Sequence, residues 1–261
     1  MIGRWLLGAY AALVTLFLLA PLVVAVSLSF SAGDRIEFPP PGFSLRWYRA
    51  LLGIEAFRTG LVNSLIIGVW VAVISAVGGT AAAIALNHYK FRGRAFVQSV
   101  TLLPLALPGV VVGLGLLSAI GLLGLRPGLV ATAIGHSVLG VPYVAYLVLA
   151  TLANYDLSLE QASLNLGASR WRTFRRITLP LIAPGLTAGA VCAFLISFDN
   201  VALSLFLARG DTLPLRLMQH IQFSADPSVA AMSTLLVAVS FVAMLPLARL
   251  FRNKTIVRMA G

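Results

Sequence analysis

The chain alternates long apolar runs with short polar connections. Six of the runs reach about 20 residues, the length that an α-helix needs to cross the hydrocarbon core of a bilayer. The runs cover residues 5–30, 61–86, 96–123, 129–152, 182–208 and 229–250. This pattern predicts an all-α, polytopic membrane protein, with six transmembrane helices that form a single domain over residues 1–261.

Composition supports a membrane protein. Hydrophobic residues make up 59% of the 261 residues and charged residues only 10%, whereas soluble domains carry about 25% charged residues. So few charges cannot cover a surface that faces water. The net charge of +11 is explained by basic loops beside anionic lipid headgroups, so we expect no nucleic-acid partner. The single cysteine, Cys192, lies inside an apolar run and excludes a disulfide framework.

The distribution of basic residues predicts the orientation of the spans. Of the 19 Lys and Arg residues, 12 flank one set of span ends and 7 flank the other. Lys and Arg are enriched in cytoplasmic loops of membrane proteins. We therefore expect both termini, the connection around residue 92 and the polar loop 153–181 to lie in the cytoplasm.

Prolines interrupt the third apolar run. Pro104 and Pro108 lie four residues apart, and each removes a backbone donor and crowds the preceding turn. Irregular backbone survives at membrane depth where protein or a wet cavity satisfies its polar groups. Two interpretations stay open: a packing kink, and a broken helix that lines a solute pathway.

Asp199 is the one acidic residue within an expected span, and it lies near the outer end of the fifth run, in the sequence Ser197-Phe198-Asp199-Asn200. A charge in a membrane helix costs several kcal/mol unless it is paired or hydrated, so it suggests a functional site. The alternative is a structural Asp bonded to a neighbouring helix. Two glycine pairs, Gly109-x-x-x-Gly113 and Gly185-x-x-x-Gly189, predict close helix packing.

The longest polar interruption in the second half of the chain is residues 153–181. Ser158 and Gln161 have the spacing of a capping box, with Ser158 at the N-cap. Glu160 falls in the first turn, where the helix dipole favours an anion. Gly167 can adopt the left-handed conformation that ends a helix. The pattern predicts a short helix that ends in a sharp turn.

A second short helix is expected to follow that turn. Ser169 is a suitable N-cap for residues 170–177, which are rich in Arg, and Pro180 is expected to end this helix before the fifth span begins. The loop is thus expected to be compact, with two helices lying at the cytoplasmic surface. A surface helix bound to lipid headgroups would explain the arginines but not the glycine turn.

These residues resemble a known motif. Glu160-Gln161-Ala162, a glycine seven positions after Glu160, and Ile177-x-Leu179-Pro180 resemble the EAA loop of ABC-importer permeases, with Gln161 in place of the first alanine. The resemblance extends along nearly the whole chain. Within the family, the segment that begins at Ser197 and the sequence Thr212-Leu-Pro are most similar to permeases of the spermidine/putrescine type.

The resemblance implies a type I ABC importer permease fold in a bacterial inner membrane. It implies a coupling helix that docks in a groove of a cytoplasmic ATPase, a second permease subunit, and a periplasmic or extracellular solute-binding protein. The residues implied for ATPase coupling are Glu160, Gln161, Ala162, Leu166, Gly167 and Ala168. The residues suggested for the substrate pathway are Ser197, Phe198, Asp199, Asn200, Pro104 and Pro108.

The chain is not expected to be an enzyme. A phosphate-binding P-loop needs a lysine after a glycine-rich loop, and neither Lys90 nor Lys254 has that setting. No catalytic residues and no metal site are expected, and ATP with its Mg²⁺ would be used by the partner ATPase. The resemblance favours a polyamine as solute. Alternatives are the same architecture with another solute (iron, phosphonate, opine or amino-acid-like), or a stand-alone secondary transporter.

Overall fold

The computed structural model describes residues 2–153, 156–223 and 226–259, and the regular secondary structure of this part is helical apart from one isolated β-bridge between Ser31 and Phe43. The elements, in chain order, are α1 (Ile2–Ser29), α2 (Arg46–Gly53), α3 (Glu55–His88), α4 (Arg94–Leu102), η1 (Leu103–Leu105), α5 (Gly109–Leu122), α6 (Leu129–Leu152), α7 (Ser158–Asn165), α8 (Arg170–Thr173), η2 (Phe174–Thr178), α9 (Leu179–Phe198), α10 (Val201–Leu207), α11 (Leu213–Phe223) and α12 (Ser228–Met259).

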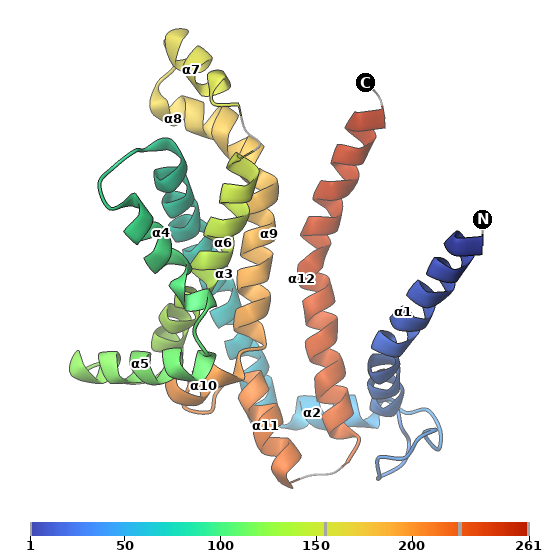
Figure 1. Cartoon of the computed structure of the whole chain (residues 1–261). Coiled ribbons are helices and arrows are strands. Elements are labelled where there is room, and N and C mark those ends of the chain that lie inside the picture. The colour runs from blue at the N-terminus through green and yellow to red at the C-terminus, as the bar shows by residue number, and fades with distance from the viewer. Residues whose placement is uncertain (1, 154–155, 224–225, 260–261) are drawn as a thin grey trace.

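Helices α3, α6 and α9 pack against one another and form the core (Figure 1). Their backbones approach closely, because a Cβ placed at Gly79 or Gly189 would lie 2.6 or 2.7 Å from atoms of Val144. At Gly185 the same Cβ would lie 2.5 Å from the Leu147 carbonyl oxygen. Since lipid tails are as apolar as the helices, close packing has to hold such helices together. The close packing predicted from the glycine pair in α9 is confirmed.

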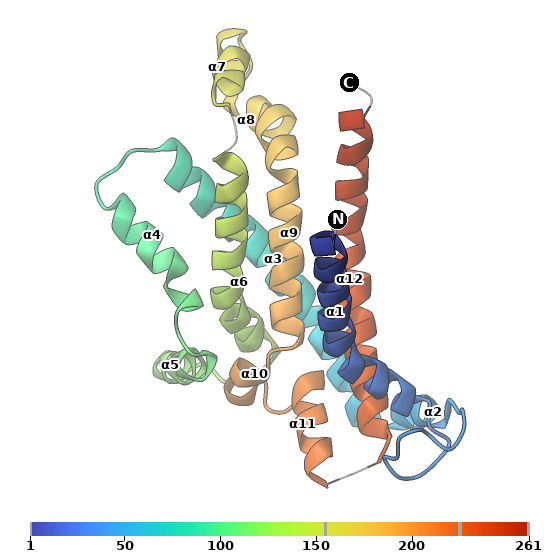
Figure 2. The same ribbon diagram turned by 45° about the vertical axis from the view of Figure 1, so that its right-hand side comes forward.

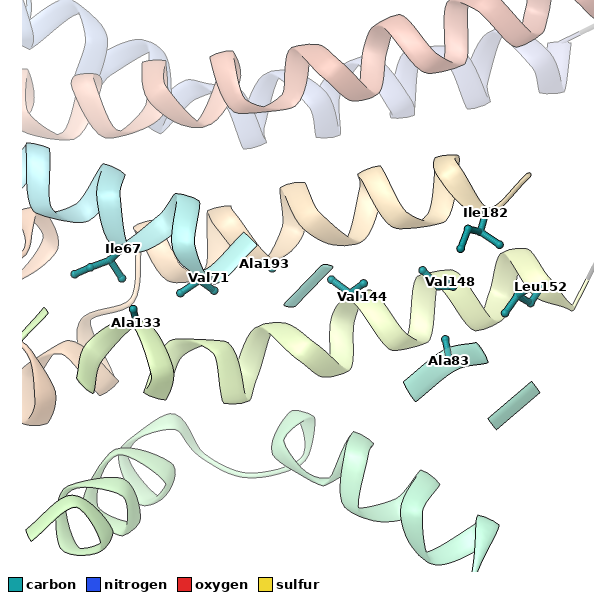
Figure 3. Close-up of a cluster of buried hydrophobic side chains, with 9 residues drawn as sticks. All are labelled: Ile67, Val71, Ala83, Ala133, Val144, Val148, Leu152, Ile182 and Ala193. Atoms are coloured by element: carbon teal, nitrogen blue, oxygen red, sulfur yellow. The ribbon is translucent and has the colours of Figure 1, made fainter. Parts of the chain in front are cut away.

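Nine buried apolar side chains fill the space between these three helices (Figure 3). They are Ile67, Val71 and Ala83 from α3, Ala133, Val144, Val148 and Leu152 from α6, and Ile182 and Ala193 from α9. Protein interiors at this density transmit strain between elements. The three helices thus form one continuous apolar core.

Five helices of the described chain are long and apolar enough to cross a membrane, and a sixth span exists if one bent pair of helices counts as one. That pair is Arg94–Leu105 with Gly109–Leu122, whose axes differ by 109°. Of the two interpretations of the proline pair, this bend is that of a broken helix rather than a packing kink. The physical reason is the proline pair, which prevents regular helical hydrogen bonds on both sides of the break. Figure 2 shows α5 end-on below α4.

The fifth expected span, residues 182–208, is also divided. Helix α9 ends at Phe198, and α10 begins at Val201 after a short break. At its other end α9 is longer than expected, because α8 continues through the π-helical turn η2 into α9. Pro180 does not end the second short helix, which corrects that prediction. Pro180 lacks the N–H that would bond the carbonyl of Arg176, and the wider π turn accommodates this loss.

The two ends of the bundle differ. Helices α7 and α8 lie at one end, toward which the described ends of α1 and α12 also point, while α2, α10 and α11 lie at the other end (Figures 1 and 2). Helix α1 lies apart from the three core helices and contacts α12. Only 6% of its most apolar segment is buried, so α1 presents an apolar surface to its surroundings.

Candidate coupling site and pathway break

The polar loop folds as a helix, a tight turn and a second helix. Helix α7 ends where Gly167 adopts φ +84°, in the left-handed region. The N–H of Gly167 bonds the carbonyl of Leu164 at 3.0 Å, and the N–H of Ala168 bonds the carbonyl of Ser163 at 3.1 Å. This pair of bonds is the Schellman motif, which satisfies the last carbonyls of a helix. The predicted glycine turn is confirmed.

The start of α7 differs from the prediction. Ser158 lies within the first turn and makes no side-chain cap, so the predicted capping box is wrong. The Ser158 N–H instead donates to Asp156 Oδ1 at 2.9 Å. The backbone N–H of Ser158, and then its hydroxyl, hold the pKa of the exposed Asp156 carboxyl below its usual value. Asp and Ser both favour helix starts, and Asp156 lies two positions before Ser158.

Glu160 connects α7 to two core helices. Its Oε2 lies 3.0 Å from Nε2 of His88, the last residue of α3, and its Oε1 accepts a hydrogen bond of 2.5 Å from the Thr178 hydroxyl, directly before α9. The side chains of Glu160 and His88 are only 16% and 18% exposed. Hydrogen bonds to a carboxylate are stronger than those between neutral groups. Glu160 therefore fixes α7 to the end of α3 and the start of α9.

Further contacts make the loop compact. The hydroxyls of Ser163 and Thr173 lie 2.9 Å apart and join α7 to α8. Ser169 accepts a hydrogen bond from the Arg172 N–H at 3.3 Å, which confirms its predicted role as N-cap of α8. A cavity of about 330 Å³ lies between α7, α8 and the end of α3, and the Glu160–His88 pair is part of its wall.

The outer surface of the loop is exposed. Leu166 is 89% exposed at the tip, and Gln161, Ala162 and Gly167 are also exposed, while Ala168 is half-buried. The four arginines of residues 170–176 are exposed as well. Of the six residues expected to couple to an ATPase, Glu160 is the one whose side chain is held within this chain. The others lie at or near the free surface of the loop.

The other end of α9 contains the four consecutive residues 197–200, which have different surroundings. Residues 197 and 198 end α9, and residues 199 and 200 form the break before α10. Asp199 is exposed in an open hollow of about 450 Å³ beside the last turn of α9. Asn200 is the N-cap of α10 and accepts a hydrogen bond of 2.8 Å from the Leu203 N–H. Ser197 and Phe198 are buried in the interior of this chain. Only Asp199 and Asn200 are therefore accessible for contact with a solute in this arrangement.

Phe198 cannot offer its ring to a cation here. Its side chain has 0% exposure and stacks on Phe194 with the ring centroids 5.6 Å apart. Phe198 was expected in the substrate pathway, whereas in this chain its ring is buried. The ring occupies the core because an apolar side chain at the end of α9 packs against the start of α11 and the first turn of α12.

His136, which the sequence did not single out, lies at the same break. It is buried in α6 with 2% exposure. Its Nδ1 lies 2.9 Å from the Ser197 hydroxyl and its Nε2 lies 3.3 Å from the Ser204 hydroxyl. Its partners are 61 and 68 positions away, so no local pattern could have identified it. The same holds for His88 and Glu160, which are 72 positions apart.

The proline break is adjacent to the Asp199 break. Pro104 is half-buried in η1, and Pro108 is exposed and precedes α5 as its N-cap. Helix α5 packs on α10, where a Cβ at Gly109 would lie 3.3 Å from the Ala202 Cβ and one at Gly113 would lie 2.6 Å from the Phe206 ring. The helices that follow the two breaks, α5 and α10, thus pack against each other at the predicted glycine pair Gly109 and Gly113.

Among the described residues, no group of three or more His, Cys, Asp or Glu side chains gathers at metal-binding distance. The family described as "Binding-protein-dependent transport system inner membrane component" matches residues 74–256. The chain belongs to this family.

The permease is similar in sequence to two curated relatives. It is 30% identical over 257 residues to the spermidine/putrescine transport system permease protein PotC of Escherichia coli K12, covering 98% of this chain and 97% of the relative. It is also 30% identical over 257 residues to a protein of Salmonella typhimurium LT2 described as a putative 2-aminoethylphosphonate transport system permease, PhnV, covering 96% of each chain.

The fold of the permease matches a solved structure. A chain in the crystal structure of a bacterial alginate ABC transporter, in complex with an alginate pentasaccharide-bound periplasmic protein, superposes with a TM-score of 0.73 at 18% sequence identity. The match covers 97% of this chain and 96% of that chain. It confirms the predicted all-helical ABC importer permease fold.

The family assigns the role of the permease. It is the multi-pass inner-membrane subunit of a binding-protein-dependent ABC importer, which works with an ATPase and a periplasmic binding protein. Permeases of this family are transport subunits and not enzymes, and ATP is used by the ATPase rather than bound as a cofactor of the permease. The stand-alone secondary transporter is thereby excluded.

Proposed function

We propose that the permease imports a polyamine. The observation that carries this proposal is the full-length similarity to a spermidine/putrescine permease. The exposed carboxylate of Asp199, beside the break of α9, supports it because a carboxylate at a membrane pathway attracts a cation and disfavours an anion. Asn200 and the nearby proline break of residues 104–108 complete the proposed pathway wall.

A second candidate solute is 2-aminoethylphosphonate. The sequence identity to the Salmonella relative is the same as that to the Escherichia coli relative, and the coverage is almost the same. That solute carries both an amine and a phosphonate, so Asp199 would bind the amine, and a cation elsewhere would have to bind the phosphonate. The amine is common to both solutes, and Asp199 has the same role in each.

Competition in one preparation distinguishes the two solutes. The permease, reconstituted in liposomes with its ATPase, its binding protein and its partner permease, should take up labelled putrescine or spermidine only when ATP is present. An excess of unlabelled 2-aminoethylphosphonate should not compete. Uptake of labelled 2-aminoethylphosphonate with no effect of polyamines would overturn the polyamine proposal and favour the second candidate.

We further propose that α7 docks on the ATPase through its exposed surface. Leu166, Gln161, Ala162, Gly167 and Ala168 would form the contact, with the Leu166 side chain as an apolar projection at the tip. Glu160 would act from the other side of α7 and transmit the movement of the docked helix to α3 and α9, because its carboxylate bonds to both.

A second permease subunit would complete the pathway. The hollow beside Asp199 is open on this chain, and α1 presents an apolar surface to its surroundings. Both observations suit a pathway enclosed between two permeases. Co-purification of a tagged permease in mild detergent should yield two permease chains, of one or two kinds, per pair of ATPases.

The loop and both termini would lie in the cytoplasm. The larger share of Lys and Arg at this end, 12 of 19, supports this orientation, as does the position of α7 and α12 toward the same end of the bundle. A green fluorescent protein fused to the C-terminus should be fluorescent, and an alkaline phosphatase fused there should be inactive. The reverse pattern would contradict this orientation.

A further inference from the structure

His136 joins two helices that the chain itself separates. Ser197 lies in the last turn of α9 and Ser204 lies in α10, and residues 199–200 between the two helices form the break. His136 contacts both serines from α6, at 2.9 and 3.3 Å. All three side chains are buried, with at most 5% exposure. One ring nitrogen therefore contacts α9 and the other contacts α10, on the buried side of the break.

The hydrogen-bond chemistry of this triad is complete. A neutral imidazole has one nitrogen that donates and one that accepts. Each serine hydroxyl can donate or accept, so both ring nitrogens are satisfied in either tautomer. Buried polar groups that lose such partners are costly. The arrangement thus favours one relative position of α9 and α10 over others.

The other hydrogen bonds near the break, among the described residues, hold different parts of α10. The carbonyl of Leu207 accepts a hydrogen bond of 2.8 Å from the Gly128 N–H, which holds the far end of α10 against the start of α6. Asn200 caps the first turn of α10 from within the break itself. His136 adds hydrogen bonds from α6 to the end of α9 and to the middle of α10.

We propose that His136 is a positioning residue for the solute pathway, and that it sets the place of Asp199 and Asn200 by holding α9 and α10 at a fixed relative position. The proposal rests on the proposed function, because it treats the break at residues 199–200 as part of the pathway. His136 itself does not touch the solute, since it is buried behind the break.

Uptake by the assembled importer is the first test. His136→Leu keeps an apolar side chain of useful size but removes both hydrogen bonds. Uptake per assembled complex should fall about tenfold, the factor that corresponds to the loss of roughly one buried hydrogen bond. His136→Gln offers an amide donor and an acceptor, and should restore uptake to within about twofold of the unaltered permease.

Ser137→Ala is the matched control. Ser137 is the next residue in α6, is buried, and bonds only the carbonyl of Ala133 in its own helix, at 2.7 Å. Its removal deletes a buried hydroxyl without touching the break. Uptake should stay within about twofold of the unaltered permease. An equal loss of uptake in Ser137→Ala and His136→Leu would overturn the proposal.

A distance measurement reports the position of the helices directly. Spin labels would be placed at Leu181 in α9 and Leu205 in α10, which are 41% and 53% exposed. Cys192, the single cysteine, would be replaced by Ala, and the labelled chain would be diluted with unlabelled chain in the complete complex. The distance distribution should be narrow in the unaltered chain and in Ser137→Ala, and broader or shifted in His136→Leu.

The outcomes separate this proposal from the proposed function. An unchanged distance distribution in His136→Leu overturns the positioning role, whatever happens to uptake. A changed distribution combined with full uptake by Asp199→Asn supports the positioning role and contradicts the placing of Asp199 in the pathway.

Discussion

One acidic side chain lies at each end of α9, and the two have opposite surroundings. Glu160, against the first turn, is 16% exposed and bonds His88 and Thr178. Asp199, directly after the last turn, is exposed, and its carboxylate has no hydrogen-bonded or ionic partner among the described residues. The sequence indicated a functional role for both acidic residues. Their contacts differ: the Glu160 carboxylate connects helices, and the Asp199 carboxylate is accessible to a solute.

Helix α9 connects the two sites. It has 20 residues, and a helix rises 1.5 Å per residue, so α9 is about 30 Å long. Its sides are packed tightly on α3 and α6. A movement that enters at the Glu160 end therefore reaches the Asp199 end through a rigid element. We infer that the Glu160 end of α9 controls the movement of the helix and that the Asp199 end controls the passage of the solute.

Replacing Glu160 should have the largest effect. Glu160→Ala removes the acceptor for His88 and Thr178, and each hydrogen bond to a charged group contributes about 1.5–3 kcal/mol. Stimulation of ATP hydrolysis by loaded binding protein should fall more than about tenfold. Glu55→Ala, at an exposed acid in the first turn of α3, should leave this stimulation unchanged. Normal stimulation in Glu160→Ala would contradict the coupling role.

Replacing Gly167 should have the next largest effect. No atom lies within 4 Å of a Cβ placed there, so a side chain would be strained only by the backbone, at φ +84°. That strain costs about 1–2 kcal/mol for an ordinary L-residue, and coupling in Gly167→Val should fall about tenfold. Asn tolerates this conformation, so Gly167→Asn should couple nearly normally. Equal losses in the two variants would mean that the ATPase needs a flat surface here.

Replacing Asp199 should affect passage alone. Asp199→Asn keeps the size of the side chain and removes the charge. Uptake should fall about fivefold, while assembly and basal ATP hydrolysis stay unchanged, because the side chain is bonded to nothing that holds the fold. Glu37→Gln, at an exposed acid in the loop between α1 and α2, serves as the control. Full uptake by Asp199→Asn would remove Asp199 from the pathway.

Truncating Leu166 should have the smallest effect. Most side chains at an interface cost less than about 1 kcal/mol when truncated, so the affinity of the permease for the ATPase should fall about threefold in Leu166→Ala. Leu122→Ala is a matched control, because Leu122 is 90% exposed but lies at the end of α5. Sedimentation or surface-binding measurements on purified complexes would resolve this difference.

Local signals in the sequence predicted local structure well. The lengths of the apolar runs, the glycine turn at Gly167 and the cap at Ser169 depend on residues within a few positions of one another. The proline pair indicated a break but not its size, because the 109° bend depends on how α5 packs against α10. At the start of α7 the sequence indicated Ser158 as the cap, whereas in the structure the Ser158 N–H donates to Asp156 Oδ1.

Contacts between distant residues could not be predicted in this way. The partners of Glu160 and His136 lie on other helices, and periodicity does not say which helices meet. For the same reason Phe198 was expected to face a pathway, although it is buried against Phe194. Glu160 was singled out with the other residues of its motif, but the sequence did not show that its side chain bonds His88 and Thr178.

The most direct test is to measure uptake and ATP hydrolysis together, in one liposome preparation, for Glu160→Ala and Asp199→Asn. In Glu160→Ala, uptake and the hydrolysis stimulated by binding protein should fall in parallel, so the ATP used per imported solute stays about the same. In Asp199→Asn, uptake should fall while hydrolysis continues, so the ATP used per solute rises. If both variants change this ratio in the same way, the two ends of α9 do not have the separate roles assigned to them.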